Sequence, residues 1–274
     1  FSRSILYSLG FSSNFYFWSS GQVYGAENSL LKPFLHTWSL SVEEQFYILF
    51  PLVLLVTFKI LRKKLIHILI LGFIISLFIA DWGSKNHPSF NFYVLPTRAW
   101  ELLAGSILAY FEISKGHRSR NQMLNLLSPA IGLLLIGHSI LFFNNEMFHP
   151  SFFTVSPIVG VCLIIWYSNK DELITKILST KLFVGVGLIS YSLYLWHYPI
   201  FAFSRTALYT QGNLFKQIII AFVIFTLSLI TFKYIEQPFR NKKNKFKIVI
   251  SLIVILIFFL MFINLNIIQQ GGYN

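Results

Sequence analysis

Long apolar stretches alternate with short polar connections along the whole chain. The pattern predicts membrane helices, because a helix that crosses a bilayer needs about 20 mostly apolar residues. We therefore expect an all-α, polytopic membrane bundle with about nine transmembrane helices, forming a single membrane-embedded domain over residues 1–274. The expected spans cover residues 4–18, 42–61, 65–80, 98–111, 123–143, 151–167, 182–204, 214–235 and 246–268.

The composition supports this interpretation and leaves no room for a soluble domain. Hydrophobic residues make up 55% of the chain and charged residues only 12%, whereas about a quarter of the residues are charged in ordinary globular domains. The single cysteine, Cys162, lies inside an apolar stretch. We expect it to pack against its neighbours and to form no disulfide.

The basic residues indicate how the chain is oriented. A net charge of +12 would favour a nucleic-acid partner in a soluble protein. Here most Lys and Arg residues fall in alternate connections, over residues 62–64, 115–120, 170–181 and 240–247, and such basic connections stay in the cytoplasm. We therefore expect membrane lipid and no nucleic acid among the partners, with the first polar motif at the outer face.

That first motif covers residues 36–51, where a polar segment runs directly into an apolar helix. It places His36, Glu43 and Glu44 at the mouth of a membrane span, where ionisable groups are costly and usually functional. A structural alternative is a capping box, in which Ser41 and Glu44 satisfy backbone N–H groups at a helix start. The capping box explains those two residues but leaves His36 and Glu43 unexplained.

A second candidate is the pair Arg98 and Glu101. Their spacing of three places them on one face of a helix, where the two side chains can pair. A carboxylate inside an apolar segment needs a cation or a water-filled cavity. The pair is therefore either part of a functional site or an ion pair that only stabilises its helix.

A third candidate is a polar stripe on the helix expected over residues 182–204. Ser190, Tyr194 and His197 are spaced four and three residues apart, so they share one helix face, and we expect that face to point inward. A single histidine in a membrane helix often only packs. A histidine at the end of a Ser/Tyr stripe is a better candidate for chemistry.

A fourth motif, residues 234–240, is expected at the inner face. Pro238 is expected to end the preceding helix, and a run of cations follows it. A stop signal with cytoplasmic anchoring is the structural alternative for this segment.

The four motifs together resemble the acyltransferase 3 family, and within it the bacterial O-antigen and peptidoglycan O-acetylases. They read HTWSLSVEEQFYILFP (36–51), LPTRAWELLAG (95–105), ISYSLYLWHYP (189–199) and YIEQPFR (234–240). The resemblance implies an acyltransferase of the bacterial inner (plasma) membrane. Such an enzyme carries an acyl group from acetyl-CoA to a hydroxyl of a cell-envelope glycan, for example the O-antigen of lipopolysaccharide, and needs no metal.

Acyl transfer to a hydroxyl needs a base and a group that stabilises the oxyanion. By resemblance, His36 or His197 would orient or deprotonate the acceptor, and Arg98 would hold charge. The glutamates would fix those cations. The candidate catalytic residues are His36, Glu43, Glu44, Arg98, Glu101 and His197, and the candidate substrate-binding residues are Trp38, Ser190, Tyr194, Glu236 and Arg240.

Two further readings stay open at this stage. Members of the family open with helices that bear a histidine thought to be catalytic and an Arg-x-x-Arg motif, and this sequence contains neither, so we expect the chain to be amino-terminally truncated and its activity alone to be in question. An inactive fragment is therefore one alternative. A polysaccharide exporter or flippase is another, but transporters often show internal repeats, and none of the four motifs recurs.

Overall fold

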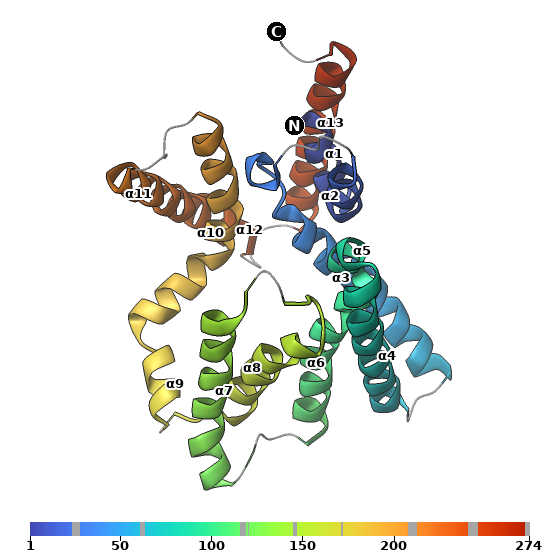
Figure 1. Ribbon diagram of the computed structural model, residues 1–274, viewed down its shortest axis with the longest axis vertical. Helices are drawn as coiled ribbons and strands as arrows, with labels where there is room; N and C mark the ends of the chain where they lie inside the picture. The colour runs from blue at the N-terminus through green and yellow to red at the C-terminus, as the bar shows by residue number, and fades with distance from the viewer. Residues whose placement is uncertain are drawn as a thin grey trace. The chain divides into compact units, whose positions relative to one another are not determined.

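The structure, a computed structural model, consists of helices throughout the residues that it describes (Figure 1). These are all residues except 24–27, 61–63, 116–118, 120, 145–146, 171, 208–212, 241–245 and 272–274. The all-α prediction is confirmed for this part of the chain. The predicted cytoplasmic cations Arg62, Lys63, Arg118, Arg120, Lys242, Lys243 and Lys245 lie outside the described residues.

The helices follow one another along the chain as α1 (Ser2–Leu9), α2 (Ser13–Gly21), η1 (Ser29–Leu31), α3 (Thr37–Ile60), α4 (Leu65–Asn86), α5 (Pro88–Tyr93), α6 (Leu95–Lys115), α7 (Gln122–Phe142), η2 (Phe152–Thr154), α8 (Val155–Tyr167), α9 (Leu173–Leu178), α10 (Lys181–Thr206), α11 (Leu214–Thr231), η3 (Phe232–Glu236), α12 (Gln237–Arg240) and α13 (Phe246–Gln269).

Five of the described helices are long and apolar enough to cross a membrane. They are α3, α4, α7, the continuous helix Leu214–Arg240 and the helix Lys247–Gln269. The protein is therefore a helical membrane protein. The helices α6 and α10 contain 21 and 26 residues, and their more polar sequences distinguish them from these five. The total of nine spans stays a prediction.

The first predicted span, over residues 4–18, is wrong. The structure divides it into α1 and α2, because the chain turns between Gly10 and Ser12. The N–H of Gly10 donates to the Leu6 carbonyl, and Phe11 adopts a φ of 50°, in the left-handed region that commonly ends a helix. Neither helix alone has the length of a span.

The described chain forms two compact units, residues 1–41 with 184–274 and residues 42–183. In the first unit α1 packs against α13, and the Trp196 indole N–H of α10 donates to the Thr231 hydroxyl of α11 at 2.8 Å. In the second unit α4 packs against α6, and α7 packs against α8 (Figure 1).

Buried hydroxyl groups join α2 to the start of α3. The Thr37 hydroxyl donates to Ser13 Oγ at 3.0 Å, and Ser13 Oγ lies 2.7 Å from Ser41 Oγ. The backbone N–H of Ser13 also donates to Ser41 Oγ. Because α3 begins at Thr37, Ser41 lies inside the helix and uses its hydroxyl for a neighbouring helix. The capping box of Ser41 with Glu44 is therefore wrong, and interhelical hydrogen bonding replaces it.

Candidate functional site

A cluster of imidazole and phenol rings lies where the segment before α3 meets α10, within the first unit. The His36 ring is 5.1 Å from the Tyr194 ring, 5.6 Å from the His197 ring and 5.4 Å from the Tyr198 ring, measured between centroids. The side chain of His36 is only 6% exposed. The two histidines that the sequence singled out, 161 positions apart, therefore meet. We call His36, Tyr194, His197 and Tyr198 the histidine cluster.

Hydrogen bonds fix α10 against the segment that carries His36. The Tyr194 hydroxyl donates to the His36 carbonyl and lies 2.6 Å from Ser39 Oγ. One turn further on, the Tyr198 hydroxyl donates to the Ser29 carbonyl at 2.9 Å. These bonds join α10 to a segment more than 150 residues earlier in the chain, and they thereby fix the distance between the His36 and His197 rings. Tyr194 thus acts on His36 through its backbone.

The His197 ring is held in one tautomer. Its Nδ1 lies 2.7 Å from the Tyr194 carbonyl oxygen and 3.3 Å from that of Leu193. A carbonyl only accepts, so Nδ1 carries the proton, and in the neutral ring Nε2 keeps its lone pair. A histidine oriented in this way can take a proton from a hydroxyl through Nε2.

The His36 ring is buried, and among the described residues neither of its nitrogens has a well-aligned hydrogen bond, although the backbone at Pro33 and at Leu195 lies close enough to interact with it. A buried polar group of this kind is rare and calls for an explanation such as a ligand or water. Burial and the neighbouring His197 imidazole lower the pKa of His36 from 6.5 to about 4, although the backbone at Pro33 and Leu195 partly opposes this shift. His36 is therefore uncharged at neutral pH.

The low pKa of His36 predicts acid sensitivity. Its pKa lies below that of an unfolded histidine, so protonation favours the unfolded state, and stability that is complete above about pH 6.5 is lost as the pH falls toward 4. The thermal unfolding midpoint in detergent should fall over that window. His36→Gln should flatten this dependence, and an equally steep dependence in the variant would assign it to other groups.

A second polar cluster lies around Glu236, which contacts α10 at Ser192, five residues before His197. One carboxylate oxygen accepts from the Ser192 hydroxyl at 3.0 Å, and the other accepts from the Arg240 guanidinium at 3.0 Å. Ser192 is fully buried, and it is not part of the predicted stripe, because a residue two positions from Ser190 lies on a different face of the helix. Its burial and its contact with Glu236 depend on how the helices pack, so no local sequence pattern indicates them.

Two expectations near this cluster are wrong. The helix does not end at Pro238 but continues to Arg240. The residues just before the proline form the π-helix η3, whose wider turn leaves room for the proline ring. Ser190 does not point inward with Tyr194 and His197. It is exposed, and its hydroxyl donates to the Gly187 carbonyl of its own helix, since Ser192 takes the buried side.

The predicted ion pair of Arg98 with Glu101 is confirmed, with 3.0 Å between Nη1 and Oε1. The Arg98 Nε–H also donates to the Phe92 carbonyl at 3.3 Å, and the guanidinium lies 4.8 Å from the centre of the Phe92 ring. The pair is partly buried and belongs to the second unit. Its side chains are therefore positioned by α5 as well as by α6.

The candidate residues are divided between the two units. His36, Trp38, Ser190, Tyr194, His197, Glu236 and Arg240 belong to the first unit, and Glu43, Glu44, Arg98 and Glu101 belong to the second. Trp38 on α3, and Glu43 and Glu44 further along it, are partly buried. The expectation that Arg98 and the glutamates act on the same substrate as the histidines stays a prediction.

The fold and these clusters define a helical membrane protein with paired imidazoles and embedded carboxylates, a combination suited to acyl transfer. The chain belongs to the acyltransferase 3 family, whose description is "Acyltransferase domain" and which matches residues 4–233. The predicted resemblance is thus confirmed over most of the chain.

Curated relatives are similar over nearly all of the chain. "Peptidoglycan O-acetyltransferase OatA" of Listeria monocytogenes is 31% identical over 256 residues, which are 87% of this chain and 40% of the relative. "O-acetyltransferase OatA" of Staphylococcus aureus strain NCTC 8325 is 30% identical over 261 residues, which are 89% of this chain and 42% of the relative. The chain therefore spans about two fifths of the length of these relatives. No solved structure matches.

Proposed function

We propose that the protein is a membrane O-acetyltransferase that transfers an acetyl group from acetyl-CoA to a hydroxyl of a cell-envelope glycan. The observation that carries this proposal is the histidine cluster, where the buried His36 ring and the His197 ring lie 5.6 Å apart and the Tyr194 carbonyl fixes the proton of His197 on Nδ1. The family and the activity stated in the names of its relatives support it.

The residues have distinct roles in this proposal. His197 Nε2 takes the proton of the acceptor hydroxyl as its oxygen attacks the acetyl carbonyl carbon, and later returns that proton to the leaving thiolate. Acetyl-CoA supplies the acetyl group as a thioester, whose C–S bond breaks. His36, neutral at pH 7, holds the acceptor by a hydrogen bond. Arg98 and Glu101 belong to the second unit and keep the charge-holding role that the family resemblance implies.

Binding of the donor is assigned to the predicted cytoplasmic face. Arg240 is 68% exposed although it pairs with Glu236, so its guanidinium has further donors that fit the phosphates of coenzyme A. Glu236, held by Ser192, fixes the direction of this arginine. Basic connections in the cytoplasm of the bacterial inner membrane, and a glycan acceptor on the opposite side, complete the proposed orientation.

Peptidoglycan is the acceptor that the names of the relatives favour, whereas the O-antigen of lipopolysaccharide is the acceptor that the sequence motifs also allow. Both glycans carry sugar hydroxyl groups that could accept an acetyl group. The histidine cluster acts on the hydroxyl alone, so the choice between the two glycans depends on the binding surface around it.

Expression of the complete reading frame in a bacterium whose glycans lack O-acetyl groups tests the proposal. Base-labile acetate should appear on purified peptidoglycan or on lipopolysaccharide, and mass spectrometry of the released saccharides should locate it. The variant His197→Asn, made in parallel, should show at least a roughly hundredfold smaller amount of acetate. Glycan export without acetate on either polymer would favour the exporter reading and overturn the proposal.

A further inference from the structure

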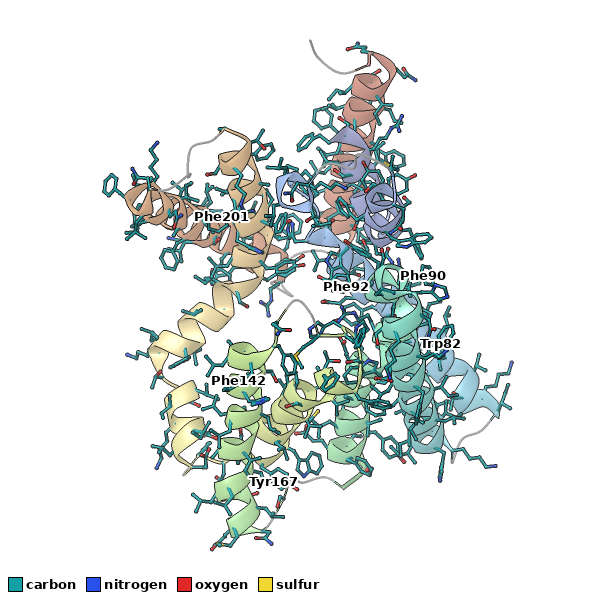
Figure 2. All side chains as sticks on the ribbon, viewed as in Figure 1. Trp82, Phe90, Phe92, Phe142, Tyr167 and Phe201 are labelled. Carbon is teal, nitrogen blue, oxygen red and sulfur yellow. The ribbon has the colours of Figure 1, made fainter. Side chains whose placement is uncertain are left out.

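A cavity of about 640 Å³ lies in the second unit, between α5 and the connection from α7 to η2. Its volume is in the usual range for ligand-binding sites. None of the residues in the four sequence motifs lines it. Figure 2 labels Phe92, which lines the cavity, on α5.

The lining combines flat rings with groups that form hydrogen bonds. Phe92, Tyr93 and Phe148 are the aromatic residues of the lining, and Ser89, Asn144 and His149 are residues with a hydroxyl, an amide and an imidazole. A saccharide has an apolar C–H face and a rim of hydroxyls. Aromatic faces are electron-rich and suit the C–H face, while amide and hydroxyl groups suit the rim.

A second cavity in the same unit provides a contrast. It measures about 470 Å³ and lies among α4, α6 and α8, where its lining includes Phe73, Ile107 and Cys162. Every residue of that lining is apolar or aromatic, with Trp100 as the only indole. Such a cavity suits a lipid chain. The polar residues in the lining of the first cavity therefore suit a polar ligand, whereas the second cavity suits a hydrocarbon chain.

The walls of the first cavity are held from behind by Asn91, which is 1% exposed. Its side-chain amide donates to the Ala80 carbonyl at 3.0 Å and to the Pro150 carbonyl at 3.3 Å, so α4, α5 and the segment before η2 are joined through one residue. Gly83 makes room for it, because a Cβ there would lie 2.3 Å from Asn91 Oδ1. The cavity is therefore built into the packing.

The cavity is next to the ion pair of Arg98 and Glu101. Phe92 lines the cavity with its side chain, and the same ring lies beneath the Arg98 guanidinium at 4.8 Å. The cavity also borders the carboxyl-terminal ends of α4 and α7. The basic residue Lys64 precedes α4 at the opposite end of that helix. By the positive-inside rule, the end with Lys64 is expected in the cytoplasm, and the cavity is therefore expected at the outer end of α4.

We propose that this cavity is a saccharide-binding subsite that holds the glycan acceptor on the outer side of the second unit. The inference rests on the proposed function for the identity of the glycan, namely the disaccharide repeat of peptidoglycan. The juxtaposition of aromatic rings, hydrogen-bonding groups and the buried, hydrogen-bonded Asn91 argues for the subsite itself.

Two phenylalanines of one connection provide a matched test. Phe148 and Phe152 are both 45% exposed, but only Phe148 lines the cavity, whereas the Phe152 ring packs against Phe78. In the complete protein in detergent, the dissociation constant of the N-acetylglucosaminyl-N-acetylmuramic acid disaccharide should rise roughly tenfold in Phe148→Ala. Phe152→Ala should change it less than twofold. Asn144→Ala should weaken binding in the same direction as Phe148→Ala.

The outcomes separate the subsite from the proposed function. Equal affinities in Phe148→Ala and Phe152→Ala, at matched thermal unfolding midpoints, would overturn the subsite. Wild-type protein that binds the disaccharide but adds acetate to neither peptidoglycan nor lipopolysaccharide in cells would retain the subsite and overturn the proposed function. Wild-type protein that acetylates the disaccharide with the same KM as Phe148→Ala would retain the function and reject this cavity.

Discussion

The variant His197→Asn is expected to lower acetyl transfer by roughly 10²- to 10⁴-fold, which is the usual contribution of a positioned general base. Asparagine keeps a donor near the Tyr194 carbonyl, so it preserves the local hydrogen bond that Nδ1 makes at 2.7 Å, but it lacks Nε2. The loss therefore isolates the proton-accepting atom. Acetate transferred to peptidoglycan per molecule of enzyme, with the enzyme quantified in membranes, measures the effect.

An imidazole elsewhere in the chain supplies the control. His138 on α7 is exposed and stacks on Phe142, with 5.0 Å between ring centres, and it is not part of the histidine cluster. His138→Asn makes the same chemical change and should leave transfer within about twofold, as surface substitutions usually do. Equal activity in His197→Asn and His138→Asn would remove His197 from the catalytic machinery.

Chemical rescue distinguishes catalysis from packing at His197. The variant His197→Ala opens a space beside His36, where the native rings lie 5.6 Å apart. Added imidazole can occupy such a space and accept the proton, so it should restore part of the transfer rate without changing the amount of folded protein. A purely structural role predicts recovery of the unfolding midpoint and no recovery of the rate.

Local spacing was sufficient to predict some of these features. The pair of Arg98 and Glu101 follows from a separation of three residues on one helix, and the structure places the two side chains 3.0 Å apart. The all-α class likewise follows from apolar stretches of span length. Such features depend only on helix geometry and on the low solubility of polar groups in a bilayer.

Other features depend on contacts between segments that are distant in the chain, and no local sequence pattern predicts such contacts. The meeting of His36 with His197 requires α10 to bond to the segment before α3 through Tyr194. Ser41 looked like a helix cap because its bond to Ser13, 28 positions earlier, leaves no local pattern. The bond of Glu236 to Ser192, 44 positions earlier on a different helix, likewise leaves no local pattern.

The contact between α7 and α8 depends on two glycines, and Gly132→Ala is therefore expected to destabilise the second unit. A Cβ at Gly132 would lie 2.5 Å from the Gly160 carbonyl oxygen, and a Cβ at Gly160 would lie 2.6 Å from the Gly132 carbonyl oxygen. These distances are to backbone, so the two helices must separate to accept a methyl group. Overpacking of this kind costs about 1–3 kcal/mol or more.

Gly137, five residues further along α7, is the matched control, because a Cβ there would meet nothing within 4 Å. Alanine favours a helix over glycine by about 1 kcal/mol, so Gly137→Ala should keep or raise the unfolding midpoint in detergent while Gly132→Ala lowers it. The double variant Gly132→Ala/Gly160→Ala should lose less than the sum of the two single losses, since helices already separated by one methyl group accept the second at lower cost. Equal midpoints for Gly132→Ala and Gly137→Ala would mean that α7 and α8 do not pack through these glycines.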